Sequence, residues 1–193
     1  MEKGDKGRTI RMILIIRTNK ESLHDLEFVK PIEKILSERG FKFFVKHYSK
    51  VNKADLKKAE KVIICGTSLK DGEYLYPKNF EYFKWITTFQ KPIFGICAGA
   101  QILAVLHGQK LFACEEIGNI FVIFKKEFLG CEMKMEVYAL HQMSFNAPKD
   151  KFIEFVKSKK CVHTIKVINK PFYGVLFHPE VKNHKIIENF CES

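Results

Sequence analysis

The residue best suited to chemistry is a cysteine in the middle of the chain. Cys97 follows a short apolar run at residues 93–96 and precedes a segment, residues 102–106, whose apolar residues have helical spacing. The residues between, 98–100, are Ala-Gly-Ala, so the backbone can turn sharply there. The pattern predicts a strand, a tight turn at Cys97 and a helix whose first amides favour a negatively charged sulfur. A cysteine held in this way is suited to act as a thiolate nucleophile.

A base for that nucleophile is offered by His178, because imidazole changes its charge near neutral pH. Glu180 lies two positions later, and side chains two residues apart in an extended segment point to the same side. Pro179 restrains the backbone between them and favours extended dihedrals at His178. The carboxylate can therefore orient the imidazole, which completes a cysteine–histidine–glutamate triad for attack on an amide.

Taken alone, a cysteine is more often a small buried hydrophobic residue, and a histidine before a proline is often an ordinary loop residue. The segments around Cys97 and around His178, taken together, favour catalysis. Residues 95–101, Gly-Ile-Cys-Ala-Gly-Ala-Gln, resemble the nucleophile signature Gly-x-Cys-x-Gly-x-Gln of the class I glutamine amidotransferases. Residues 173–181 resemble the His-x-Glu motif of the same family, and the two motifs come in the family's order. The resemblance covers nearly the whole chain from Met12 onward.

The resemblance implies the remaining parts of a glutaminase site. It implies that the backbone N–H groups of Gly66 and Ala98 form an oxyanion hole. It also implies that Thr67, Gln101 and His141 contact substrate glutamine. On its own, Gln101 is equally well explained as an amide on a helix surface, and His141 as a polar residue at the end of a strand.

Within the family, the chain is most similar to the separate glutaminase subunits of archaeal-type GMP synthases. It departs from the family at residues 65–68, where Cys-Gly-Thr-Ser replaces a loop that more often carries Gly-Gly-Pro. It also departs at residues 17–24, where those subunits tend to carry Asp-Asn with Gly-Gln-Tyr and a histidine. The chain has no Gly-rich phosphate loop of its own.

The resemblance therefore implies a partner, an ATP-dependent synthase that accepts the ammonia. A synthase that aminates xanthosine monophosphate is the first choice, and another amidotransferase synthase is the second. Two alternatives stay open: a stand-alone γ-glutamyl hydrolase, and a non-catalytic binding subunit on the same fold.

Patterns that predict buried strands alternate with patterns that predict helices, which favours a three-layer, flavodoxin-like α/β fold. Its sheet is expected to be mainly parallel, with helices on both faces. The predicted strands cover residues 12–16, 41–48, 61–65, 93–96 and 173–177. The predicted helices cover residues 23–39, 54–59, 79–89, the segment up to 106 that follows Cys97, and 182–191. Strand-like runs also predict antiparallel additions in the C-terminal half, at residues 120–124, 133–140, 151–156 and 162–168.

Composition sets the outer bounds. The 193 residues, 46% of them hydrophobic, fit a charged tail at residues 1–11 followed by one domain at residues 12–193, and Met12 is an alternative start. No apolar stretch is long enough to cross a bilayer and no signal-peptide core is present, so a cytoplasmic protein is expected. The six cysteines include no Cys-x-x-Cys pair, and five histidines, His163 among them, show no ligand spacing, so no metal or cofactor is expected.

The formal net charge of +11 suits either a solvated surface or an acidic docking face on the synthase. The lysines are spread along the chain, without a long basic run or an RNA-binding motif. Nucleic acid is therefore not an expected partner.

Overall fold

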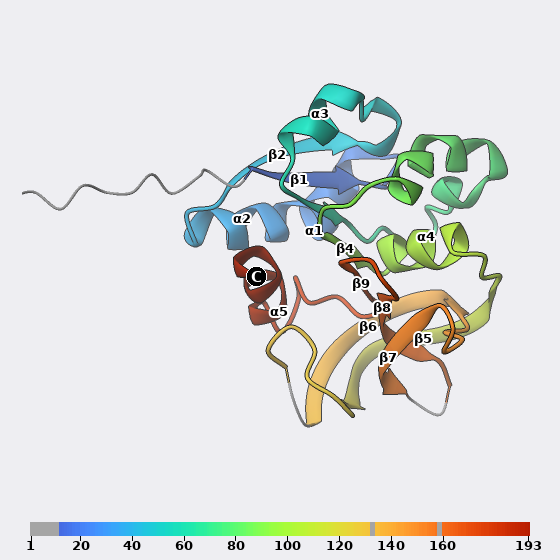
Figure 1. Ribbon diagram of the computed structural model, residues 1–193. Helices are drawn as coiled ribbons and strands as arrows, with labels where there is room; N and C mark the ends of the chain where they lie inside the picture. Colours follow the sequence, from blue (N-terminus) through green and yellow to red (C-terminus); the bar gives the residue numbers. More distant parts are fainter. Residues whose placement is uncertain (1–11, 132–133, 158–159) are drawn as a thin grey trace, which may run out of the picture.

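The computed structural model describes residues 12–131, 134–157 and 160–193, so the predicted tail at residues 1–11 lies outside the described residues. Within them, seven strands form one sheet in the order β2-β1-β3-β4-β9-β8-β7 (Figure 1). The strands are β1 (Met12–Arg17), β2 (Lys42–His47), β3 (Lys61–Ile64), β4 (Ile93–Ile96), β7 (Phe152–Lys157), β8 (Val162–Val167) and β9 (Phe172–Val175). The pairs from β2 to β9 are parallel, whereas β8 and β7 are antiparallel additions. The predicted fold class is confirmed.

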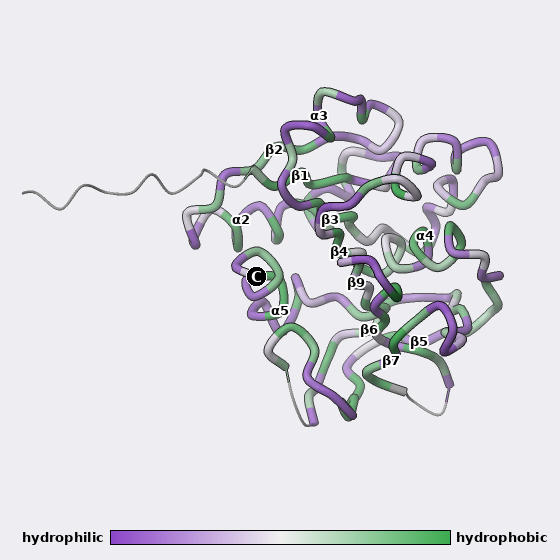
Figure 2. The backbone as a smooth tube through the Cα atoms, viewed as in Figure 1, coloured by the Kyte–Doolittle hydropathy of each residue, from purple (hydrophilic) through white to green (hydrophobic). Residues whose placement is uncertain are grey.

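Helices cover both faces of the sheet, because successive residues of its central strands point to opposite faces and nearly all are apolar. Ile13 and Ile15 of β1 join one buried cluster with α2 (Lys30–Glu38) and α5 (Lys185–Glu192). Leu14 and Ile16 join another with α4 (Ala98–Leu106) and η4 (Pro77–Thr87). Figure 1 shows α2 and α5 together on one side of the sheet and α4 on the other, and Figure 2 shows the hydrophobic colouring of the strands between them. The helices are η1 (Ser22–His24), α1 (Asp25–Phe28), α2 (Lys30–Glu38), η2 (Tyr48–Lys50), α3 (Lys53–Lys58), η3 (Glu73–Leu75), η4 (Pro77–Thr87), α4 (Ala98–Leu106) and α5 (Lys185–Glu192). None of these described helices is long and apolar enough to span a membrane.

The predicted helix at residues 23–39 is interrupted in the structure. The short 3-10 helix η1 is followed by α1, which ends at Phe28. The helix α2 then begins at Lys30, with Pro31 in its first turn. Proline lacks the N–H that a continuous helix would need, but it fits the first turn, where that group has no partner within the helix. The predicted helix at 79–89 is a 3-10 helix rather than an α-helix, and it forms η4.

Two further strands, β5 (Leu111–Ile123) and β6 (Lys134–Phe145), form a long antiparallel ribbon beside the main sheet (Figure 1). The sequence prediction found only the end of β5, because Glu115, Glu116 and Gly118 interrupt the apolar pattern before residue 120. The pairing with β6 is also irregular there, with a register shift between Ala113 and Glu116. The ribbon is tied to the segment after β9, since the N–H of His178 donates to the carbonyl oxygen of Tyr138 at 2.8 Å. The ribbon thus holds one of the predicted catalytic residues.

The turn from β4 into α4 leaves no room for a side chain at residues 95 and 99. A Cβ atom on Gly99 would lie 2.4 Å from the carbonyl oxygen of Ile64 on the neighbouring strand. A Cβ atom on Gly95 would lie 2.5 Å from the backbone of Gly99. Glycine at both positions lets the helix start directly against the sheet.

The first prediction concerns this close approach. Gly99→Ala should destabilise the fold by about 1–3 kcal/mol, because the added methyl group meets backbone that cannot rotate away. Urea unfolding followed by circular dichroism measures the change. Gly72→Ala is the control, because a Cβ atom on Gly72 meets nothing within 4 Å. Equal stability of the two variants would contradict the prediction.

Candidate active site

Cys97 lies at the carboxyl end of β4 in a backbone conformation that few residues other than glycine adopt. Its φ is 47° and its ψ is −99°, and α4 begins at the next residue. The N–H of Cys97 donates to the carbonyl oxygen of Val175 at 2.7 Å, which clamps the turn to the end of β9. Strained residues that their surroundings hold in place are typical of reactive sites, and the carboxyl edge of a parallel sheet is where α/β folds usually bind ligands.

The structure brings Cys97, His178 and Glu180 together. Nδ1 of His178 lies 2.7 Å from Oε1 of Glu180, and both side chains are buried. Nε2 of His178 and Sγ of Cys97 each lie 3.4 Å from the carbonyl oxygen of Leu140 on β6. Both nitrogens of the His178 ring therefore face oxygens that only accept hydrogen bonds, which the doubly protonated imidazolium satisfies in full.

The charge on His178 is favoured by its neighbours. Burial, the largest single influence, lowers the pKa of His178, but the charges of Glu180 and Cys97 and hydrogen bonds to both raise it. The combined effect raises the pKa of His178 well above its ordinary value.

Gly66 and two residues that the sequence analysis did not single out, Phe28 and Thr18, hold the His178 ring and the loop beside it. The ring of Phe28 lies 5.5 Å from it between centroids, and a Cβ atom on Gly66 would lie 2.6 Å from its Cε1 atom. Thr18 Oγ1 donates to the carbonyl oxygens of Cys65 and Gly66, at 3.2 and 3.0 Å, which fixes the loop after β3. No motif marks Phe28 or Thr18, because their roles depend on the position of the loop.

The two residues predicted for the oxyanion hole flank the nucleophile. Ala98 is the first residue of α4, where the N–H groups have no acceptor within the helix. Gly66 follows β3, and its hypothetical Cβ atom would lie 3.5 Å from the Cβ atom of Cys97. Both backbones are therefore next to the sulfur-bearing residue, as an oxyanion hole requires.

Of the residues predicted to bind substrate, Gln101 lies one turn after Cys97, since its N–H donates to the carbonyl oxygen of Cys97 at 3.0 Å, and Thr67 directly follows Gly66. The Gln101 amide accepts from the Tyr74 hydroxyl at 2.5 Å and donates to the carbonyl oxygen of Met143 at 2.9 Å, so its orientation is fixed. Burial, with the nearby charge of Cys97, raises the pKa of Tyr74 well above its ordinary value. Thr67 Oγ1 is buried and has no hydrogen-bond partner within the described part of the chain.

His141 is turned away from the triad. Its Nδ1 lies 3.0 Å from the carbonyl oxygen of Cys114, and its Nε2 lies 3.4 Å from Oε2 of Glu116. Burial is the main influence on this ring and lowers the pKa of His141. The backbone of the preceding residue, Leu140, makes the contact with the triad instead.

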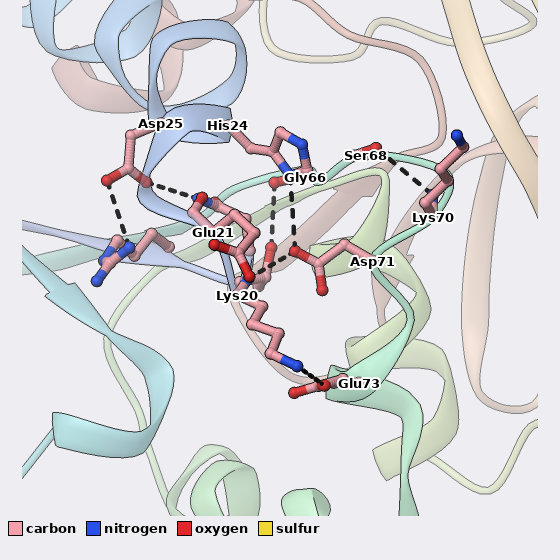
Figure 3. A network of polar contacts seen from close by, with 12 residues as sticks. Lys20, Glu21, His24, Asp25, Gly66, Ser68, Lys70, Asp71 and Glu73 are labelled. Atoms are coloured by element: carbon pink, nitrogen blue, oxygen red, sulfur yellow. Dashed lines mark hydrogen bonds and ion pairs between the residues drawn. The ribbon is translucent and has the colours of Figure 1, made fainter.

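Residues 17–24, where we expect the sequence to depart from the family pattern, support the loop after β3 together with Asp25 (Figure 3). The backbone N–H of Lys20 donates to Asp71, and Lys20 Nζ lies 2.7 Å from Glu73 Oε1. Asn19 donates to Asp25 at 2.7 Å. The two segments therefore form one polar network around the loop that carries Gly66.

Comparison with known proteins shows the family of the chain. The family described as glutamine amidotransferase class-I matches residues 22–192. A subunit of the glutamine-hydrolyzing GMP synthase of Ignicoccus hospitalis is 30% identical over 135 residues, which are 63% of this chain and 71% of that protein. The corresponding GMP synthase subunits of Methanothermobacter thermautotrophicus and Methanobrevibacter smithii are 32% and 36% identical over 56% of this chain. These last two matches span 64% and 63% of the relatives' own length.

Solved structures show the same fold. A protein from Thermoplasma acidophilum, whose structure was described as that of a candidate GMP synthase subunit, superposes with a TM-score of 0.82 over 96% of this chain and 94% of that one, at 20% identity. A glutamine amidotransferase from Thermotoga maritima superposes with a TM-score of 0.70 at 24% identity, over 95% and 81% of the two chains.

The second prediction follows from the charges around His178. Glu180→Gln should lower the pKa of His178, because it removes a negative charge that raises this pKa. The neutral ring should then appear at a lower pH than in the unchanged protein. NMR titration of the imidazole signals measures both midpoints, and Cys97→Ala should shift the midpoint in the same direction. An unchanged midpoint in both variants would contradict the prediction.

Proposed function

Since the chain belongs to the class I glutamine amidotransferase family, we propose that it is a glutaminase that releases ammonia from glutamine for a synthase partner. The observation that carries this proposal is the buried arrangement of Cys97, His178 and Glu180 at the carboxyl edge of the sheet. A sulfur nucleophile, an imidazolium and an orienting carboxylate are the groups that amide cleavage through a thioester requires.

In the proposed reaction, the Cys97 thiolate attacks the side-chain carbonyl carbon of glutamine. The negative oxygen that forms accepts hydrogen bonds from the N–H groups of Gly66 and Ala98. The His178 imidazolium gives its proton to the departing nitrogen, so that ammonia leaves and a γ-glutamyl thioester remains. The neutral imidazole then takes a proton from water, which attacks the thioester and releases glutamate and the thiolate.

Glu180 is proposed to orient the ring, as its 2.7 Å contact with Nδ1 of His178 supports. Thr67 is proposed to bind the substrate through its hydroxyl, whose hydrogen-bonding capacity no described residue uses. Gln101 is proposed to shape the pocket, because its amide is already held by Tyr74 and Met143.

The third prediction tests the nucleophile. Cys97→Ala should reduce glutamine-dependent ammonia release by about 10⁴-fold or more, because no thioester can form. Glu180→Gln should reduce kcat less severely, because the nucleophile and the base are both still present. Coupled glutamate dehydrogenase detects the ammonia. Ammonia release that survives in Cys97→Ala would refute the proposal.

The two alternatives give different outcomes in the same assay. A stand-alone γ-glutamyl hydrolase would cleave γ-glutamyl dipeptides faster than glutamine. A non-catalytic binding subunit would cleave neither, and its Cys97 would not react with a glutamine-like alkylating analogue even with the synthase present.

The proposed partner is an ATP-dependent synthase, with xanthosine monophosphate as the first choice of acceptor. The names of the relatives support this, because each is one subunit of a glutamine-hydrolyzing GMP synthase. Exposed apolar side chains near the triad also support a docking face. Leu23 and Leu26 lie just before Phe28, whose ring contacts His178, and the exposed Val181 directly follows Glu180. Large exposed apolar side chains that gather around a site are typical of protein interfaces.

The fourth prediction tests this face. Leu26→Asp should weaken co-elution with the xanthosine monophosphate-aminating synthase and lower ammonia transfer to it, because a charge would be buried in the interface. Alkylation of Cys97 in the isolated chain should be unchanged. Ile123→Asp is the control, because Ile123 is 62% exposed on the ribbon and Leu26 is 63% exposed. Equal losses in both variants, or full glutaminase activity of a monomer without any synthase, would contradict the docking proposal.

A further inference from the structure

Four side chains that can bind metal converge between the ribbon and the main sheet, outside the triad. Their ligand atoms all lie within 4.8 Å of one another, and the side chains are those of Glu116, His141, Cys161 and His163. Glu116 lies on β5, His141 on β6 and His163 on β8, while Cys161 directly precedes β8. Figure 1 shows these three strands close together in the lower part of the molecule.

The distances between the ligand atoms are close to those around a tetrahedral metal ion. Oε2 of Glu116 lies 3.1 Å from Sγ of Cys161, 3.4 Å from Nε2 of His141 and 3.2 Å from Nε2 of His163. The Cys161 sulfur lies 4.0 and 3.8 Å from the same two nitrogens. Around a tetrahedral zinc ion, neighbouring ligand atoms are separated by about 3.3–3.6 Å, as its usual bond lengths of about 2.0–2.3 Å dictate. Small shifts would complete the geometry.

The hydrogen bonding of His141 also fits a metal ligand. Its Nδ1 faces the carbonyl oxygen of Cys114, which only accepts, so Nδ1 carries the proton in the neutral ring. Nε2 then presents a lone pair toward the carboxylate of Glu116, and two acceptors face each other at 3.4 Å. A cation between them removes this repulsion. A backbone carbonyl that fixes the other ring nitrogen is the usual second partner of a metal-binding histidine.

The ligand types select the ion. A thiolate with two imidazoles and a carboxylate suits zinc better than magnesium or calcium, which prefer oxygen ligands. Burial adds a second argument, because the side chains of His141 and His163 are 0% exposed and that of Glu116 is 9% exposed. One Zn²⁺ with one thiolate and one carboxylate has no net charge, whereas a lone buried carboxylate is costly.

We propose that the cluster is a structural zinc site that binds one Zn²⁺ through the side chains of Glu116, His141, Cys161 and His163. When the metal binds, the Cys161 thiol loses its proton to solvent and the sulfur bonds to the ion. Four protein ligands leave no open position for a substrate, as in structural rather than catalytic zinc sites.

The site joins the ribbon to the main sheet beside the proposed glutaminase centre. His141 is bonded along the chain to Leu140, whose carbonyl oxygen contacts both Cys97 and His178. An ion bound to His141 therefore fixes the backbone that forms one wall of that centre. The zinc proposal does not depend on the glutaminase proposal, because the ligand cluster is independent of what the triad does.

The fifth prediction concerns metal content. The full chain, purified without chelator, should contain about one zinc per molecule by plasma mass spectrometry. Cys161→Ala and His163→Ala should lose most of this zinc. Cys131→Ala should keep it, because Cys131 is as buried as Cys161, at 5% exposure each, but does not belong to the cluster.

A measurement on the unchanged chain guards against variants that fail to fold. After chelation, zinc should rebind stoichiometrically in competition with a chromogenic chelator, and the Tm should rise by about 5 °C or more. Cobalt in place of zinc should give the strong visible bands of a four-coordinate ion and a thiolate charge-transfer band, which Cys161→Ala should lack.

Several outcomes would overturn the proposal. In the first, the purified chain contains no zinc and fails to bind it when zinc is added. In the second, the variants Cys161→Ala and His163→Ala contain as much zinc as the unchanged chain. In the third, the cobalt-loaded chain shows the spectrum of an octahedral ion. A disulfide between Cys114 and Cys161, found by peptide mass spectrometry in the freshly purified chain, would also overturn it. Loss of glutaminase activity alone decides nothing about the metal, so zinc content and the cobalt spectrum are the deciding measurements.

Discussion

A charged imidazole buried against the end of the parallel sheet is the constraint on which the rest of this structure depends. His178 is fully buried, and a buried charge is tolerated only when it is paired and hydrogen-bonded. Its partners come from three places: Glu180 from the same segment, Cys97 from the strained turn after β4, and the carbonyl oxygen of Leu140 from β6. Each must be in place before the charge is stabilised, so the geometry of the site is inseparable from the packing of the sheet and the ribbon.

The ribbon of β5 and β6 has a larger role than a surface extension. It accepts a hydrogen bond from the backbone N–H of His178 at Tyr138, and it contributes the Leu140 carbonyl oxygen to the triad. Its next residue, His141, points the other way and meets Glu116 of β5. One short stretch of β6 thus serves the proposed glutaminase centre through the backbone carbonyl of Leu140 and the proposed zinc site through the side chain of His141.

The loop that carries Gly66 is held by hydrogen bonds from the segment after β1. Thr18 fixes its carbonyl groups, and Asp71 accepts from the backbone of Lys20 (Figure 3). These contacts come from Thr18 and Lys20, which lie in the segment at residues 17–24. This segment and the loop at residues 65–68 are the two places where we expect the sequence to depart from the family pattern. The two segments therefore contact each other in the fold.

The sequence by itself determined the features that depend on neighbouring residues. Apolar spacing and small residues around Cys97 predicted the strand, turn and helix that the structure contains, and the two-residue spacing of His178 and Glu180 predicted their contact. The position of Pro31 also explains why one predicted helix is two. The parallel core followed from the alternation of strands and helices, because buried strands are apolar along their whole length.

Only the tertiary structure decided the features that join distant segments. The first half of β5 has no regular alternation, because two glutamates and a glycine interrupt its apolar residues. The Leu140 contact is made by a backbone carbonyl, which no side-chain pattern can reveal. The absence of Cys-x-x-Cys spacing argued against a zinc site, yet Glu116, His141 and Cys161 meet because antiparallel pairing brings separate strands side by side. Local spacing predicts contacts within a strand or turn, whereas a site shared by three strands exists only once the sheet and the ribbon are packed.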